Sequence, residues 1–94
     1  MRVEWLRTAL KNLDDEAAYI AQDSPKAAAD FVSAIISSIE QLAQFPASGR
    51  EGRLPGTREW VVPDWPYLIP YRVRKGRVQI LRLFHTRRLP PNAW

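Results

Sequence analysis

The sequence predicts an α+β fold with the element order β-α-α-β-β-β, in which an antiparallel helical hairpin packs on an antiparallel sheet. Two observations support this prediction. Apolar residues recur at helical spacing through the first half of the chain, and after residue 57 their spacing changes to two. The length of 94 residues favours one domain, which we expect to cover residues 1–94.

The N-terminal part is expected to contain a short strand followed by the first helix. Residues 2–5 can form the strand, and we expect this strand to join the sheet. From Leu6 to Ile20, apolar residues recur on one face of a helix that covers about residues 8–22. Thr8 is the expected N-cap, since a threonine hydroxyl can accept a hydrogen bond from a free backbone N–H of the first turn.

The second helix has the clearest pattern in the sequence. Ser24 can cap its N-terminus while Pro25 occupies the first helical position, where the missing N–H of proline costs nothing. Phe45 and Pro46 end the helix, and the short break between the two helices implies an antiparallel hairpin. The apolar stripe consists of Ala28, Phe31, Val32, Ile35, Ile36, Ile39, Leu42 and Ala43. The opposite, solvent-facing side carries Asp30, Ser33, Ser37, Ser38 and Gln41.

Three strands are expected after a loop at residues 46–57, which holds three of the four glycines. These strands cover residues 58–62, 67–73 and 78–85, where apolar and polar residues alternate as is typical of strands with one buried face. Pro70 in the middle strand has no N–H to donate to a neighbouring strand. We therefore expect a bulge or an unpaired side at this position.

Composition excludes several classes of function. The chain has no cysteine and one histidine, which excludes disulfide chemistry and argues against a zinc site. No apolar run reaches the ~18 residues of a membrane-spanning helix, and the N-terminus lacks the apolar core of a signal peptide. The sequence also contains no glycine-rich phosphate loop. We therefore expect a cytoplasmic protein without membrane attachment, metal or cofactor.

The two halves of the chain differ in charge. Residues 1–48 hold four basic and seven acidic residues, a net charge of −3, whereas residues 49–94 hold ten basic and three acidic residues, a net charge of +7. Nine of those ten are arginines, whose planar guanidinium groups suit two-point contacts with phosphate or carboxylate. The second half therefore predicts a polyanionic partner, either a nucleic acid or an acidic protein, with solvated surface charge as the alternative.

Four segments between Phe45 and Arg88 carry a resemblance to a known family. They are Phe45–Arg50 at the end of the second helix, Pro55–Glu59 at the entry to the sheet, Tyr67–Val73 in the middle strand and Ile80–Arg88 at the last strand. With these segments in this order, and from Val3 onwards, the chain resembles the RelE/ParE superfamily of toxins from type II toxin–antitoxin systems. The resemblance is closer to the ParE-like branch.

The resemblance implies a toxic protein that a cognate antitoxin neutralises, the acidic C-terminal segment of the antitoxin wrapping around the toxin in a hetero-oligomer. It also implies one of two mechanisms. ParE-like toxins inhibit DNA gyrase through a binding surface alone, whereas RelE-like toxins enter the ribosome and cleave mRNA as endonucleases. The charge of the second half leaves a third possibility, a nucleic-acid-binding domain without toxicity.

The candidate catalytic residues belong to the RelE-like alternative. His85 is the single histidine, the residue type best suited to proton transfer near neutral pH, and Arg87 can supply positive charge for a phosphate. Tyr67 or Tyr71 can lie on a neighbouring strand. The opposing interpretation makes His85 a packed structural residue at a strand end. Residues 60–63 and the middle strand lack basic residues that RelE-like toxins use, so the sequence favours gyrase inhibition.

The remaining candidate residues are assigned to binding of the target or the antitoxin. All but one are arginines, and the exception is a C-terminal tryptophan, which either packs on the domain or belongs to an interface. The set consists of Arg50, Arg53, Arg58, Arg72, Arg82, Arg88 and Trp94.

Overall fold

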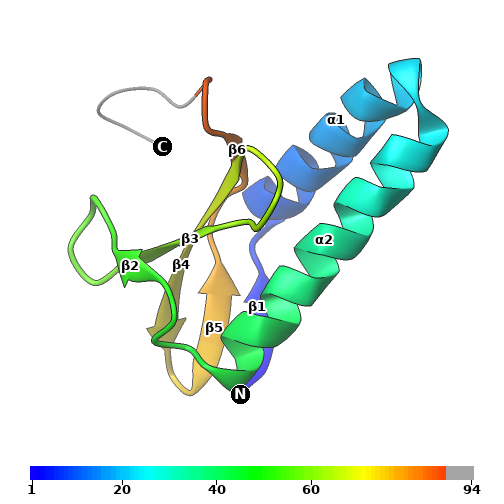
Figure 1. The fold of residues 1–94 in the computed structure, drawn as a ribbon. Helices are drawn as coiled ribbons and strands as arrows, with labels where there is room; N and C mark the ends of the chain where they lie inside the picture. Colours follow the sequence, from blue (N-terminus) through cyan, green and yellow to red (C-terminus); the bar gives the residue numbers. More distant parts are fainter. Residues whose placement is uncertain (89–94) are drawn as a thin grey trace.

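Two helices lie side by side and cover one face of a mixed sheet in the computed structural model, which describes residues 1–88 (Figure 1). This two-layer arrangement confirms the predicted α+β fold. In chain order, the elements are β1 (Arg2–Trp5), α1 (Arg7–Asp23), α2 (Pro25–Gln44), β2 (Arg50–Glu51), β3 (Arg58–Val61), β4 (Tyr67–Arg74), β5 (Arg77–Ile80) and β6 (Phe84–His85).

The sheet has the strand order β1-β5-β4-β3-β2, and β6 also pairs with β4. Neighbouring strands are antiparallel except β1 and β5, which run parallel with Val3 opposite Val78. The predicted antiparallel sheet is therefore confirmed for every pair but this one, which involves the strand whose place in the sheet the sequence leaves open. A parallel pair needs a long connection, and here both helices and the strands β2, β3 and β4 supply it. The short strand β2 lies within the expected loop and is not foreseen by the sequence pattern.

The two helix starts differ in how they are stabilised. Ser24 caps α2 as expected, because its Oγ accepts a hydrogen bond from the N–H of Ala27 (3.1 Å) and Pro25 follows it. The expected Thr8 cap of α1 is wrong: the helix begins at Arg7, after Leu6, without a side-chain cap. The N–H of Leu6 donates to the carbonyl of Ile80 (3.0 Å), so the chain passes directly from strand pairing into the helix. Within residues 1–88, no helix has the length and apolar character needed to cross a membrane.

The expected last strand is interrupted. It forms β5 and β6, which pair with opposite ends of β4. Between the two paired stretches, Ile69 and Pro70 of β4 lie opposite residues 81–83, so the connecting segment contains one residue more than β4 and bulges. The carbonyl of Pro70 still accepts a hydrogen bond from the N–H of Leu81 (3.0 Å). The bulge expected at Pro70 is confirmed.

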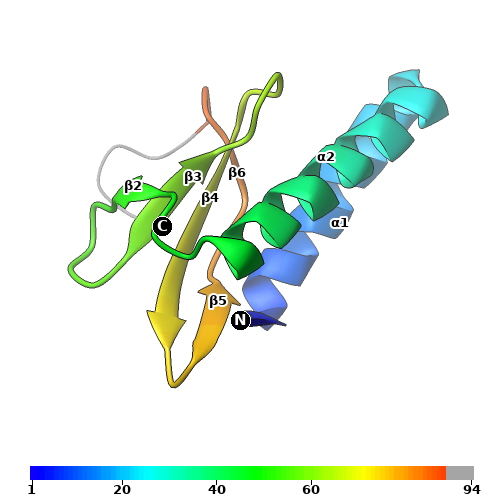
Figure 2. The same ribbon diagram turned by 60° about the horizontal axis from the view of Figure 1, so that its bottom comes forward.

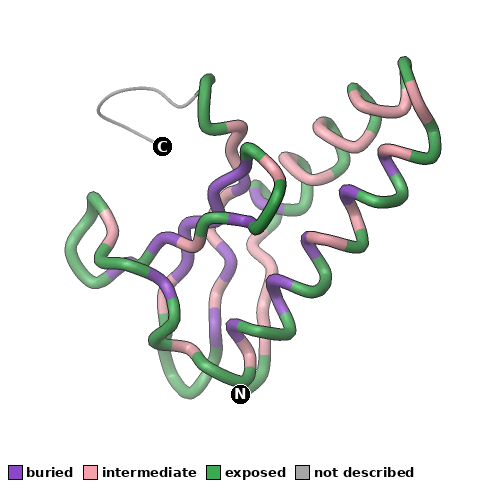
Figure 3. The backbone as a smooth tube through the Cα atoms, viewed as in Figure 1, coloured by how far each residue is buried: buried purple, intermediate pink, exposed green. Residues whose placement is uncertain are grey.

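The core lies between α2 and the sheet, where Figure 3 shows buried residues along the inner side of the helix and along the strands. The ring centroid of Phe31 on α2 lies 4.6 Å from that of Tyr67 and 5.5 Å from that of Trp65. The end of the hairpin where α1 meets α2 extends beyond the sheet (Figure 2). Among the fully buried side chains are Tyr71, Phe31, Ile35, Leu42, Ile69 and Ile80.

Candidate functional site

The sheet has one face turned away from the helices, which we call the outer face, and its register places Arg50 and Arg72 of the predicted binding residues there. Side chains alternate between the two faces along a strand, and directly paired residues share a face. Tyr71 belongs to the core, so Pro70 and Arg72 point to the outer face. Glu59 is paired with Pro70, and Arg50 is paired with Glu59, so both share the outer face.

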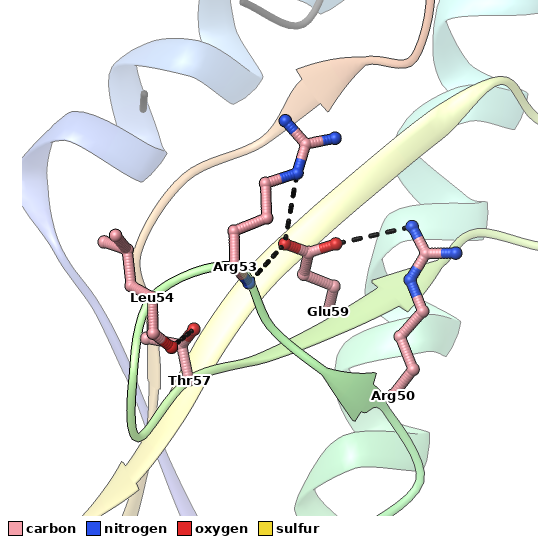
Figure 4. Close-up of polar contacts among 5 residues, drawn as sticks. All are labelled: Arg50, Arg53, Leu54, Thr57 and Glu59. Carbon is pink, nitrogen blue, oxygen red and sulfur yellow. Dashed lines mark hydrogen bonds and ion pairs between the residues drawn. The ribbon is translucent and has the colours of Figure 1, made fainter. Parts of the chain in front are cut away.

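A buried carboxylate positions two of these arginines (Figure 4). Glu59 is 3% exposed, and Arg50 Nη2 lies 3.3 Å from its Oε1 while Arg53 Nε lies 3.8 Å from its Oε2. The backbone N–H of Arg53 also donates to Oε2 (3.2 Å). Such partners offset the desolvation of a buried charge. The side chains of Arg50 and Arg53 stay 61% and 40% exposed, so Glu59 holds them in place at the protein surface.

Two further arginines of the outer face contact neighbouring side chains. Arg72 Nε donates to Gln79 (2.6 Å), and Gln79 Nε2 donates to Glu4 (2.6 Å), which links β4, β5 and β1. The guanidinium carbon of Arg82 lies 5.2 Å from the ring centroid of Phe84, a cation–π contact. The pairing of β6 with β4 puts Phe84 on the outer face, so Arg82 belongs to this face as well.

Arg58 binds the loop that follows α2. Its Nη1 donates to the carbonyl of Gly49 (2.8 Å). In the same place, the buried Tyr71 hydroxyl donates to the Pro46 carbonyl (2.7 Å) and accepts from the Gly49 N–H (2.8 Å). Burial raises the pKa of Tyr71 above its usual value. Because its hydroxyl is engaged both as donor and as acceptor, Tyr71 has a structural role and is not available as a partner of His85.

His85 lies on the side of the helices, in a hollow of about 430 Å³ near the turn between α1 and α2. The backbone N–H of Arg87 donates to His85 Nδ1 (3.2 Å), and the imidazole stands edge-on to the ring of Tyr67, with centroids 5.2 Å apart. The Tyr67 hydroxyl donates to Glu16 on α1 (2.8 Å), and Arg88 forms an ion pair with the same carboxylate. Burial raises the pKa of Tyr67 well above its usual value, and the hydrogen bond to Glu16 raises it further.

The arginines of the outer face are separated from His85, the candidate catalytic histidine. His85 faces the helices, whereas Arg72 and Arg82 lie on the outer face, with the sheet between them. The side chain of Arg87 is exposed, and Trp94 lies outside the described residues. In the part of the chain that the structure describes, no three histidine, cysteine or acidic side chains are grouped so that they could hold a metal ion.

A groove of about 540 Å³ between α2 and β3 is not foreseen by the sequence pattern. Ser38, expected on the solvent-facing side, is 3% exposed, so this expectation is wrong. A polar residue seven positions after the buried Phe31 is the signal that could have indicated this groove. The Oγ of Ser38 and the Nε1 of Trp60 are buried without a hydrogen-bond partner within residues 1–88. The groove is lined by Ala34, Ser37, Ser38, Gln41, Trp60 and Pro63.

Comparison with known proteins agrees with the resemblance found in the sequence. A family model described as the ParE toxin of the type II toxin–antitoxin system parDE matches residues 3–90. The chain is 46% identical to Y4kP of Sinorhizobium fredii, a protein whose name places it among toxins, over 98% of this chain and 95% of that protein. It is 36% identical to toxin RelE2 of Caulobacter vibrioides, over 94% of this chain and 98% of the relative.

A solved structure shows the same fold. It comes from the chromosomal ParDE toxin–antitoxin system of P. aeruginosa, and it is similar to this chain with a TM-score of 0.81 at 31% sequence identity. The similarity covers 90% of this chain and 95% of that one. Fold, family model and relatives therefore agree that the chain belongs to the ParE toxin family of type II toxin–antitoxin systems.

Proposed function

We propose that this ParE-family toxin arrests growth in the cytoplasm by binding and inhibiting DNA gyrase, without a catalytic step of its own. The observation that supports this best is that the sheet separates His85, the candidate base of a nuclease, from two of the arginines available to hold a phosphate. Cleavage of RNA through its 2′-hydroxyl requires a base, an acid and cations around one phosphate. Here the sheet separates His85 from Arg72 and Arg82, so one phosphate cannot contact all three.

The test is supercoiling of relaxed plasmid by purified gyrase in the presence of the chain. We expect inhibition by the wild type and equal inhibition by His85→Gln, because the glutamine amide can still accept the N–H of Arg87. Undisturbed supercoiling at an excess of the wild-type chain contradicts the proposal. Loss of inhibition in a folded His85→Gln variant contradicts the structural role given to His85.

Ribosome-dependent mRNA cleavage is the second candidate. His85, Tyr67 and Arg88 line one hollow, and a relative 36% identical to this chain is named toxin RelE2. Primer extension on mRNA from cells that express the chain distinguishes the two functions. Cuts that appear with the wild type and vanish with His85→Gln support the nuclease, whereas intact mRNA in arrested cells supports gyrase. A chain that arrests no growth at all points to the third possibility, nucleic-acid binding without toxicity.

We propose that the cognate antitoxin neutralises this toxin by binding in the groove between α2 and β3. The P. aeruginosa structure is described as a toxin–antitoxin system, which supports such a partner here. Ser38 Oγ and Trp60 Nε1 are buried beside this groove without partners, which costs stability, and an inserted peptide can bond to them once the groove opens slightly. The +7 net charge of residues 49–94 favours an acidic segment that folds on binding.

A bulky residue in the groove tests this assignment. Ser37 is exposed and lines the groove, so Ser37→Trp is expected to fill part of its volume without disturbing the core. We expect the affinity for the antitoxin to fall by at least about tenfold, roughly the value of one good interface contact. Ser33→Trp, at another exposed position of α2, is the matched control and should bind normally. Equal affinity of the two variants contradicts the assignment.

A further inference from the structure

Three arginines lie side by side across the sheet at the hairpin between β4 and β5. Arg74 is paired with Arg77, and Arg77 is paired with Arg2 on β1. All three point to the outer face, because the next residue along β5, the fully buried Val78, faces the helices. Lys75 in the turn adds a fourth positive charge. We call Arg2, Arg74, Lys75 and Arg77 the arginine row.

The arginine row is electrostatically unfavourable in the isolated chain. Like charges directly opposite one another on paired strands destabilise a sheet. Glu4 supplies one counter-charge, since its Oε2 lies 3.8 Å from Arg77 Nη1. Within residues 1–88, the exposed side chains of Arg2, Arg74 and Lys75 have no ion pair or hydrogen bond. A cluster in which three of four cations lack a partner among the described residues indicates a polyanionic partner.

The neighbouring residues favour duplex DNA over other polyanions. The two paired rows at this end of the outer face, Arg74-Arg77-Arg2 and Arg72-Gln79-Glu4, contain neither an aromatic nor an apolar residue. Single-stranded nucleic acids bind by stacking on aromatic rings, and an amphipathic peptide that folds on binding also needs an apolar groove. Paired strands lie about 4.8 Å apart, so the three arginines span about 10 Å, which suits closely spaced phosphates.

We propose that the arginine row binds the sugar–phosphate backbone of duplex DNA. Duplex DNA carries one negative charge per about 1.7 Å of its axis, enough to contact all four cations at once. Phosphate contacts position a protein without reading the bases, so this binding is independent of sequence. The contact is with DNA itself and requires no gyrase, so it goes beyond the function proposed above.

The test is binding of the purified full chain to a fluorescent duplex of roughly 24 base pairs, measured by anisotropy between about 50 and 200 mM salt. Arg74→Gln/Arg77→Gln removes two phosphate contacts, which is expected to flatten the slope of log K against log salt by about 2 units. We also expect affinity at about 100 mM salt to fall at least tenfold. The matched control, Lys11→Gln/Lys26→Gln, removes the same charge from the two helices and should keep the wild-type slope.

Four results overturn the proposal. The first two are absence of wild-type binding at the lowest salt, and equal salt slopes for the wild type and the arginine-row variant. The third is a loss of affinity in the control variant equal to that in the arginine-row variant. The fourth is competition by polyglutamate that is as effective as competition by DNA. Circular dichroism of every variant confirms that it is folded. Since gyrase is absent from this assay, failure of DNA binding leaves the gyrase proposal intact. Failure of gyrase inhibition likewise leaves the DNA-binding proposal intact.

Discussion

At Gly49, the fold leaves no room for a side chain. A Cβ atom there would lie 2.6 Å from the Tyr71 hydroxyl and 2.9 Å from the carbonyl oxygen of Glu59. The Tyr71 ring is fully buried and cannot move aside. We therefore expect Gly49→Ala to lower the free energy of unfolding by about 1–3 kcal/mol, as measured by urea denaturation.

Gly56→Asn is the control for this substitution. Gly56 has a φ of +79°, and a Cβ there would meet no atom within 4 Å. Asparagine tolerates such a backbone conformation, so we expect stability to change by a few tenths of a kcal/mol at most. Equal losses in the two variants would show that contact with Tyr71 is not what requires glycine at position 49.

Two buried tyrosines make stability depend on pH in the alkaline range. Burial raises the pKa of Tyr71, and burial together with Glu16 raises that of Tyr67. The folded chain therefore holds both protons more tightly than the unfolded chain, whose phenols ionise near pH 10. Their contribution to stability is fully present below about pH 10 and is lost as pH rises above it. Phenolate absorbance from Tyr67 and Tyr71 should appear only with unfolding, and its appearance in the folded chain contradicts this prediction.

At the level of elements, the cap of α2 is a local contribution that can be removed. Ser24 Oγ accepts the N–H of Ala27, so Ser24→Ala is expected to lower the free energy of unfolding by about 1 kcal/mol. Ser33→Ala, at an exposed interior position of α2, should leave stability nearly unchanged. Thermal or urea denaturation of the two variants measures the difference, and equal stabilities would contradict the role of the cap.

The elements also show which parts of the fold the sequence can predict. The start of α2 was predictable because Ser24 and Pro25 act through residues within one helical turn. The start of α1 was not predictable, because the N–H of Leu6 donates to the carbonyl of Ile80, which is far away in the sequence. The interruption of the last strand depends likewise on register with β4, although Pro70 did indicate a bulge.

At the level of the whole molecule, the positive charge of residues 49–94 was predictable from the sequence. The distribution of that charge between the two faces of the sheet was not predictable. The arginines of the second half are visible in the sequence, but their division between the outer face and the helix side follows from the register across the bulge. Long-range contacts also decide the burial of the Glu59 carboxylate and of the Ser38 hydroxyl, and the helical pattern places the second of these in solvent. The separation of His85 from Arg72 and Arg82 follows from the same register, and it is the basis of the gyrase proposal.

The most direct test of that proposal is pulse-labelling of DNA and protein synthesis in the minutes after the chain is induced without its antitoxin. A gyrase inhibitor blocks replication first, so we expect thymidine incorporation to stop while methionine incorporation continues and the cells grow into filaments. Collapse of methionine incorporation before that of thymidine would contradict the account and restore His85 and Arg87 as candidate catalytic residues.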